Sequence, residues 1–107
     1  MANFTEEVIN SVWEKATKVA NNDPNIWRKD FAGAWIRRDH YGKELPYGWE
    51  IDHLKPIFLG GTDDLDNLNP LHWRNNRKKS NNYPLFSTDV SASGTSNVDT
   101  LKSWRVE

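Results

Sequence analysis

Hydrophobic side chains near the start of the chain recur every three or four residues, the spacing that puts them on one face of a helix. The pattern predicts an amphipathic packing helix over residues 4–20, capped by Asn3 or Thr5 and ended at Asn21–Pro24. The apolar positions that carry it are Phe4, Val8, Ile9, Val12, Trp13, Ala16, Val19 and Ala20.

Residues 25–48 show no single period. Turn-forming residues interrupt a set of large apolar side chains, which are Trp27, Phe31, Trp35 and Ile36. Their spacing also fits a short helix, but the density of turn residues favours a hairpin or an irregular loop packed on the first helix.

Apolar and polar residues then alternate over residues 49–53, which predicts a half-buried strand that Pro56 stops or bends. A Gly-rich turn follows at 60–64, a return strand is expected at 69–73, and a short polar helix at 74–82. A strand, loop, strand and helix of these lengths can fold back into a ββα unit.

Ser and Thr dominate residues 87–107, which are expected to form a poorly ordered C-terminal tail. Leu101, Trp104 and Val106 leave open the alternative that its end is tied down. The sequence therefore predicts one folded domain over residues 1–86.

Composition narrows the functional classes. The chain has 107 residues, which suits one domain, and it has no Cys, which excludes disulfides and thiolate zinc sites. The N-terminal sequence does not resemble a signal peptide, and no apolar run is long enough for a membrane span. We therefore expect a cytoplasmic protein without a membrane partner.

Candidate chemistry is confined to residues 49–82. Asp52 and His53 are adjacent at the predicted strand end, Asn67 lies in the loop, and Asn76 opens the basic helix. Carboxylate and carboxamide oxygens suit Mg²⁺, and an unligated His can accept a proton from water near neutral pH. Phosphodiester hydrolysis needs both a base and a cation that neutralises phosphate charge.

This segment resembles the HNH endonuclease family, in the variant that has Asn in place of the last His. The resemblance implies an α+β fold with a ββα-metal (His-Me finger) core at about 49–82, to which this chain adds an N-terminal helix. The lack of Cys implies that the zinc knuckle of many relatives is absent. The matching positions are Ile51-Asp52-His53, Pro56, Gly60-Gly61, Asn67-Leu68, Leu71, Asn76 and Lys79.

The resemblance also implies roles. His53 would be the general base, and Asp52 and Asn76 would hold one divalent cation. Mg²⁺ is the expected cation, and Mn²⁺ is the alternative. Asn67 would pin the loop through backbone hydrogen bonds, and Lys79 would lie near the scissile phosphate. The expected products carry a 5′-phosphate and a 3′-hydroxyl.

Two features depart from the family. The paired Cys residues of many relatives are missing, and a hydrogen-bonded turn at 30–33 is expected to replace the first knuckle. The formal net charge is −1, whereas nucleic-acid binders are usually basic. Basic residues nevertheless gather locally, so we expect weak binding to nucleic acid, with DNA as the expected substrate, RNA left open, and delivery by a partner. The expected contacts are Arg74, Arg77, Lys78 and Lys79, with a second patch at Arg28, Lys29, Arg37 and Arg38.

Several alternatives stay open at this point. Asn75 could replace Asn76 as ligand, since the two are adjacent. His72 is interpreted as a packing or phosphate-side residue rather than one that faces the metal, and the acidic residues at 63, 64 and 66 as a solvated loop. The Trp side chains are expected in the core rather than stacked on bases. A non-catalytic binding module is the alternative to an active nuclease.

Overall fold

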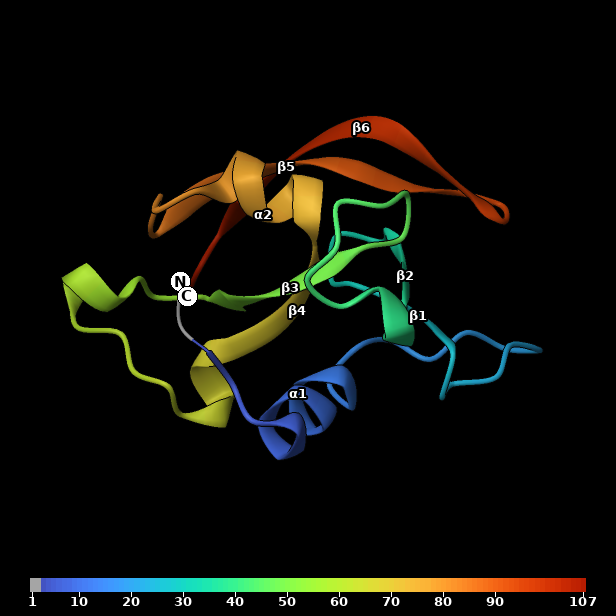
Figure 1. Ribbon diagram of the computed structural model, residues 1–107. Coiled ribbons are helices and arrows are strands. Elements are labelled where there is room, and N and C mark those ends of the chain that lie inside the picture. Colours follow the sequence, from blue (N-terminus) through green and yellow to red (C-terminus); the bar gives the residue numbers. More distant parts are fainter. Residues whose placement is uncertain (1–2) are drawn as a thin grey trace.

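The computed structural model describes residues 3–107, and its elements lie in layers around a central two-stranded ribbon (Figure 1). Strands β3 (Trp49–His53) and β4 (Leu68–His72) form this ribbon. Helix α1 (Glu6–Trp13) covers one side, and helix α2 (Trp73–Lys79) covers the other. The mixture of short helices and small sheets is α+β, as the sequence predicts.

Helix α1 begins two residues later than predicted, with Thr5 as the cap rather than Asn3, and it ends early. The side chain of Thr5 caps it by accepting a hydrogen bond from the Val8 amide at 3.2 Å. The predicted extent to residue 20 is wrong, because Thr17 exchanges backbone hydrogen bonds with Lys29 instead of continuing the helix. The buried guanidinium of Arg28 donates to the carbonyls of Glu14 and Ala16 and so satisfies backbone groups just beyond the helix end.

Strands β1 (Trp27–Lys29) and β2 (Trp35–Arg37) form an antiparallel hairpin. The hairpin interpretation of this region is thus confirmed over the helical one. The predicted hydrogen-bonded turn is also present: Gly33 N–H donates to the Asp30 carbonyl, and Ala34 N–H donates to Asp30 Oδ1. Gly33 adopts a φ of 92°, which glycine tolerates without strain.

The ribbon and α2 follow one another as predicted, with small shifts. The return strand and the helix each begin one residue earlier than expected, and α2 ends at Lys79 rather than Asn82. His72 caps α2, because its Nδ1 accepts a hydrogen bond from Arg74 N–H while its Nε2 bonds to the Pro46 carbonyl. Burial lowers the pKa of His72, and its packing role is confirmed.

The poorly ordered tail predicted for residues 87–107 is wrong. Strands β5 (Leu85–Ser93) and β6 (Ser96–Arg105) form a hairpin whose β5 strand packs on α2. A register shift at Asp89 is held by Asn75, whose Oδ1 accepts from the amides of Asp89 and Val90. Buried Phe86 and Val90 supply apolar contacts for the hairpin. The prediction gave these residues too little weight against the high Ser and Thr content of the segment. The domain boundary at residue 86 stays a prediction, although it falls within β5.

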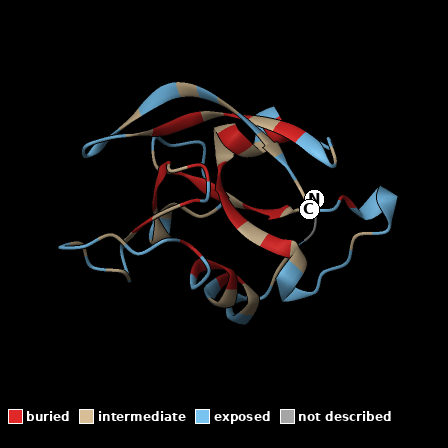
Figure 2. Cartoon of the chain, turned by 180° about the vertical axis from the view of Figure 1, so that it is seen from behind, coloured by how far each residue is buried: buried red, intermediate tan, exposed pale blue. Residues whose placement is uncertain are grey.

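The main apolar core lies between α1 and the β3–β4 ribbon. Further buried residues lie on α2 and β5 (Figure 2). Trp49 is fully buried, with ring centroids 5.3 Å from Trp13 and 4.9 Å from Tyr41. The expectation of core Trp residues is confirmed for Trp35 and Trp49, while Trp27 and Trp73 are half-buried. No helix in the described part of the chain is long and apolar enough to cross a membrane.

Candidate active site

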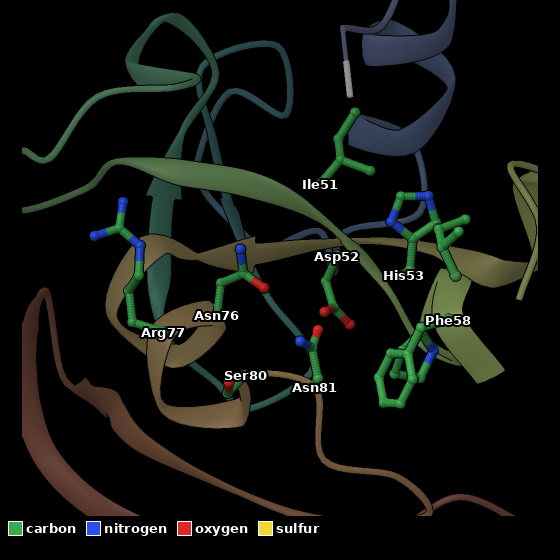
Figure 3. A pocket seen from close by; sticks show the side chains of 10 residues that line it. Ile51, Asp52, His53, Phe58, Asn76, Arg77, Ser80 and Asn81 are labelled. Atoms are coloured by element: carbon green, nitrogen blue, oxygen red, sulfur yellow. The ribbon is translucent and has the colours of Figure 1, made fainter. Parts of the chain in front are cut away.

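The C-terminal end of β3 and one face of α2 line a pocket of about 370 Å³ that is open to solvent. Asp52, His53 and Asn76 all line it, so the structure brings the three central predicted residues together (Figure 3). A second pocket shares His53, Asn76 and Arg77 with the first, so the surface is hollowed on both sides of these residues.

Asp52 is buried, with only 5% of its side chain exposed, and its two carboxylate oxygens have different surroundings. Oδ1 lies 3.2 Å from the Lys79 ammonium. Oδ2 is buried and has no hydrogen-bond partner among residues 3–107. Burial raises the pKa of Asp52 to about 6, against the opposing effect of Lys79. A buried acceptor without a donor is costly, which favours a ligand at Oδ2.

The orientation of the Asn76 amide is set by Glu50. Asn76 Nδ2 donates a hydrogen bond of 2.9 Å to Glu50 Oε1. A carboxylate only accepts hydrogen bonds, so the Asn76 nitrogen must face Glu50 and its oxygen is left for another partner. Glu50 was not predicted as a site residue, although strand alternation already places it on the same face as Asp52.

Asn75 has a different environment from its neighbour. It is fully buried, and its Nδ2 donates to Asp30 Oδ2 and to the Val90 carbonyl. With Oδ1 occupied by two β5 amides, its hydrogen-bonding groups are already used within the fold. The geometry therefore favours Asn76 over Asn75 as the residue that faces the pocket.

His53 lies at the end of β3, and its Nε2 is 2.6 Å from Asp63 Oδ1. Asp63 belongs to the loop interpreted as solvated, and its side chain is 66% exposed. This contact could not be predicted from local sequence patterns, because it depends on the path of the 54–67 loop.

Asn67 clamps that loop. Its Oδ1 accepts from Lys55 N–H at 2.9 Å, and its Nδ2 donates to the carbonyls of Lys55 at 3.1 Å and Thr62 at 2.8 Å. These are backbone hydrogen bonds of the kind expected from the sequence. Their consequence for catalysis stays a prediction.

The basic residues of α2 do not share one exposed face. Lys79 is fully buried, where it contacts Asp52 and donates to the His53 carbonyl at 3.2 Å. Arg74 pairs with Asp99 on β6, and Arg77 pairs with Glu44 and Glu50 at the pocket edge. Lys78 lines a separate hollow beside β5 and β6.

The second predicted basic patch is wrong as a continuous surface. Arg28 is buried, Arg37 pairs with Asp39, and Arg38 pairs with Glu6. Charge along the chain did not reveal this, because neighbours in sequence are used for different structural contacts.

Residues 37–82 match the HNH endonuclease family. The matched HNH segment begins at the last residue of β2 and includes β3, β4 and α2, so it contains Asp52, His53, Asn67 and Asn76. The predicted resemblance is confirmed over these residues. Domains of this family are nucleases or nucleic-acid-binding domains and typically bind a divalent metal. No curated protein and no solved structure matched the chain.

The pocket suits a hard divalent cation. The unsatisfied Oδ2 of Asp52 and the oxygen of Asn76 could serve as donors, and such oxygens suit Mg²⁺ better than soft metals. Within residues 3–107, no cluster of three or more His, Cys, Asp or Glu side chains could hold a metal. Two protein oxygens nevertheless suffice for Mg²⁺, which usually keeps several of its waters.

The stability of the metal-free protein should depend on the proton of Asp52. Its folded pKa of about 6 lies above the ordinary value of 3.8, so the folded state keeps a proton that the unfolded chain releases. The contribution of Asp52 to stability is therefore fully present below 3.8 and is lost as the pH rises through about 6, by on the order of 3 kcal/mol.

Urea denaturation in EDTA would measure this dependence on wild type and Asp52→Asn. We expect the variant to lose part of the decline between the two pKa values. Asp30 is also buried, which raises its pKa, so the difference between the two proteins is the informative quantity. Equal declines in both would contradict the assignment to Asp52.

Proposed function

We propose that the chain is a metal-dependent HNH endonuclease with a ββα-metal core, which hydrolyses phosphodiester bonds in nucleic acid. The observation that carries the proposal is the buried, unpartnered Oδ2 of Asp52, in the same pocket as Asn76 and His53. A purely structural carboxylate at this position would be expected to have both oxygens satisfied.

His53 is the proposed general base, and Asp63 determines which ring nitrogen acts. The Asp63 carboxylate can only accept a hydrogen bond, so the proton of a neutral His53 lies on Nε2. Nδ1 is then the acceptor that takes a proton from the attacking water. Asp63 would act as a positioning residue by holding this tautomer.

Asp52 and Asn76 are the proposed metal ligands. A bound divalent cation would neutralise charge on the phosphate and on the leaving oxygen. Glu50 keeps the Asn76 oxygen free by accepting a hydrogen bond from its nitrogen. Lys79 pairs with the Asp52 carboxylate and donates a hydrogen bond to the His53 carbonyl. We therefore propose that Lys79 positions the site rather than contacting the scissile phosphate, because its ammonium is fully buried.

Arg77 is the proposed phosphate contact at the pocket edge. Arg74 and Lys78 would contact phosphates further along the nucleic-acid strand. The ion pair of Arg74 with Asp99 and those of Arg77 with Glu44 and Glu50 must loosen before either Arg binds phosphate. The exposed pairs with Asp99 and Glu44 are worth little, so their exchange is feasible, but the resulting affinity should be low. DNA is the first substrate to test, and both the delivery partner and the cytoplasmic location stay predictions.

The proposal is tested by incubating supercoiled plasmid with the purified protein in Mg²⁺, in Mn²⁺ or in EDTA. We expect nicked plasmid with either metal and none in EDTA. An intact plasmid under every condition, with binding retained, would favour a non-catalytic binding module instead.

The choice of ligand is tested by substituting each of the two adjacent Asn residues. Asn76→Ala should weaken Mn²⁺ binding by about 10-fold or more, because it removes a proposed ligand. Asn75→Ala should instead lower stability by about 2 kcal/mol or more, because it leaves several buried groups unpaired. Calorimetric titration and urea denaturation of both variants would separate the effects, and the reverse result would move the ligand to Asn75.

A further inference from the structure

The loop after β3 carries an exposed apolar turn at Ile57–Leu59, a single turn of 3₁₀ helix. Phe58 is 68% exposed, and its two neighbours Ile57 and Leu59 are 55% and 43% exposed. Three consecutive large apolar side chains at the surface are unusual in a chain that has an apolar core nearby, which points to a binding role.

The loop backbone holds this apolar turn in place. Gly60 ends it with a φ of 94°, and Gly61 lies so close to the Lys55 carbonyl that a Cβ would collide with it at 1.8 Å. Asn67 binds both the amide and the carbonyl of Lys55, at the base of the turn. The exposed side chains are therefore presented on a fixed backbone.

Phe58 lines the same pocket as the catalytic residues (Figure 3). Arg77 on α2 and the residues just after the helix, Ser80 and Asn81, contribute polar groups, and Phe58 contributes a flat apolar ring from the loop. A nucleotide has the same two chemistries side by side, an anionic phosphate and a flat base. Because the apolar turn borders this pocket, we expect the ligand of the turn to be part of the nucleic acid whose phosphate lies in the pocket.

We propose that Phe58 stacks on an unpaired base next to the phosphate held in the pocket. This inference rests on the proposed function and names a class of substrate, a single-stranded or locally opened strand. Stacking on an aromatic ring tolerates every base, so it would add affinity without sequence preference. It also compensates for the weak basic surface around the site.

The test measures binding in EDTA, where no cleavage intervenes. A fluorescein-labelled single-stranded dT oligonucleotide is titrated with wild type, Phe58→Ala, Phe58→Tyr and Phe58→Leu, and anisotropy gives each dissociation constant. Phe58→Ala should bind about 10-fold more weakly and Phe58→Tyr about as well as wild type, while Phe58→Leu should fall near the Ala variant. Leu101→Ala is the matched control, since Leu101 is 70% exposed on β6, away from the pocket.

A second strand with abasic sites in place of the bases separates stacking from a structural effect. On that strand, wild type and Phe58→Ala should bind equally. The inference is overturned if wild type does not bind the dT strand, or if Phe58→Ala binds it as tightly as wild type. It is also overturned if Phe58→Leu binds as tightly as wild type, or if Phe58→Ala weakens binding equally on the abasic strand.

Sedimentation of the same proteins tests the other occupants of the apolar turn. We expect wild type and Phe58→Ala to have the same mass, and a dimer lost in the variant would assign the turn to a second copy of the chain. Plasmid cleavage is scored separately. If wild type cleaves plasmid but Phe58→Ala binds dT as tightly as wild type, only this inference is refuted. If Phe58→Ala binds dT more weakly but wild type cleaves nothing, only the proposed enzymatic function is refuted.

Discussion

His53→Ala should lower the rate of plasmid nicking by a factor on the order of 100 to 10,000, the usual contribution of a general base. The ring lies at the mouth of the pocket, and its Nε2 is bonded to Asp63. Removal of the ring takes away the proposed proton acceptor and leaves the Asp52 and Asn76 donors in place. Metal binding should therefore survive in the variant while turnover is lost.

His40→Ala is the matched control for this substitution. His40 lies in the short 3₁₀ helix at Arg38–His40, and neither pocket that flanks His53 includes it. Nicking rates under single-turnover conditions should be unchanged in this variant. A His53→Ala protein that folds, binds metal and still cuts as fast as wild type would refute the assignment of the base.

Asp30→Ala should cost about 3–5 kcal/mol of stability, a large share of what a small domain has. The carboxylate is buried and accepts hydrogen bonds from Ala34 N–H, His72 N–H and Asn75 Nδ2, at 2.8, 2.9 and 3.1 Å. It thereby joins the β1–β2 turn to the start of α2. In the variant, three buried donors lose their acceptor at once.

Urea denaturation of Asp30→Ala and of Asp66→Ala tests this role. Asp66 is an exposed acid in the 54–67 loop, so its loss should change stability by less than about 0.5 kcal/mol. If Asp30→Ala lost no more than the control, the carboxylate would not be the link between the turn and α2. Asp30→Asn should fall between the two, because it keeps one acceptor oxygen.

The order of elements could be predicted from the sequence wherever a local pattern determines them. Alternation over Trp49–His53 predicted β3, and the polar run after it predicted α2. The end of α1 was missed because long-range pairing of Thr17 with β1 replaces the helix. The β5–β6 hairpin was missed for a similar reason, since Asn75 holds its irregular backbone from another element.

The candidate site divides in the same way. The order and spacing of Asp52, His53 and Asn76 were sufficient to place them together. The residues that orient them were not found, because Glu50 and Asp63 act through contacts between elements. Charge along the chain was misleading for Lys79 and Arg28, which are both buried and serve the fold.

The most direct measurement is the identity of the ends produced from a short DNA duplex in Mg²⁺, determined by mass spectrometry of the fragments. If His53 activates water for attack on phosphorus, wild type should leave a 5′-phosphate and a 3′-hydroxyl, and neither His53→Ala nor wild type in EDTA should yield them at a comparable rate. Uncut duplex with every metal, or fragments with a 3′-phosphate, would contradict the account.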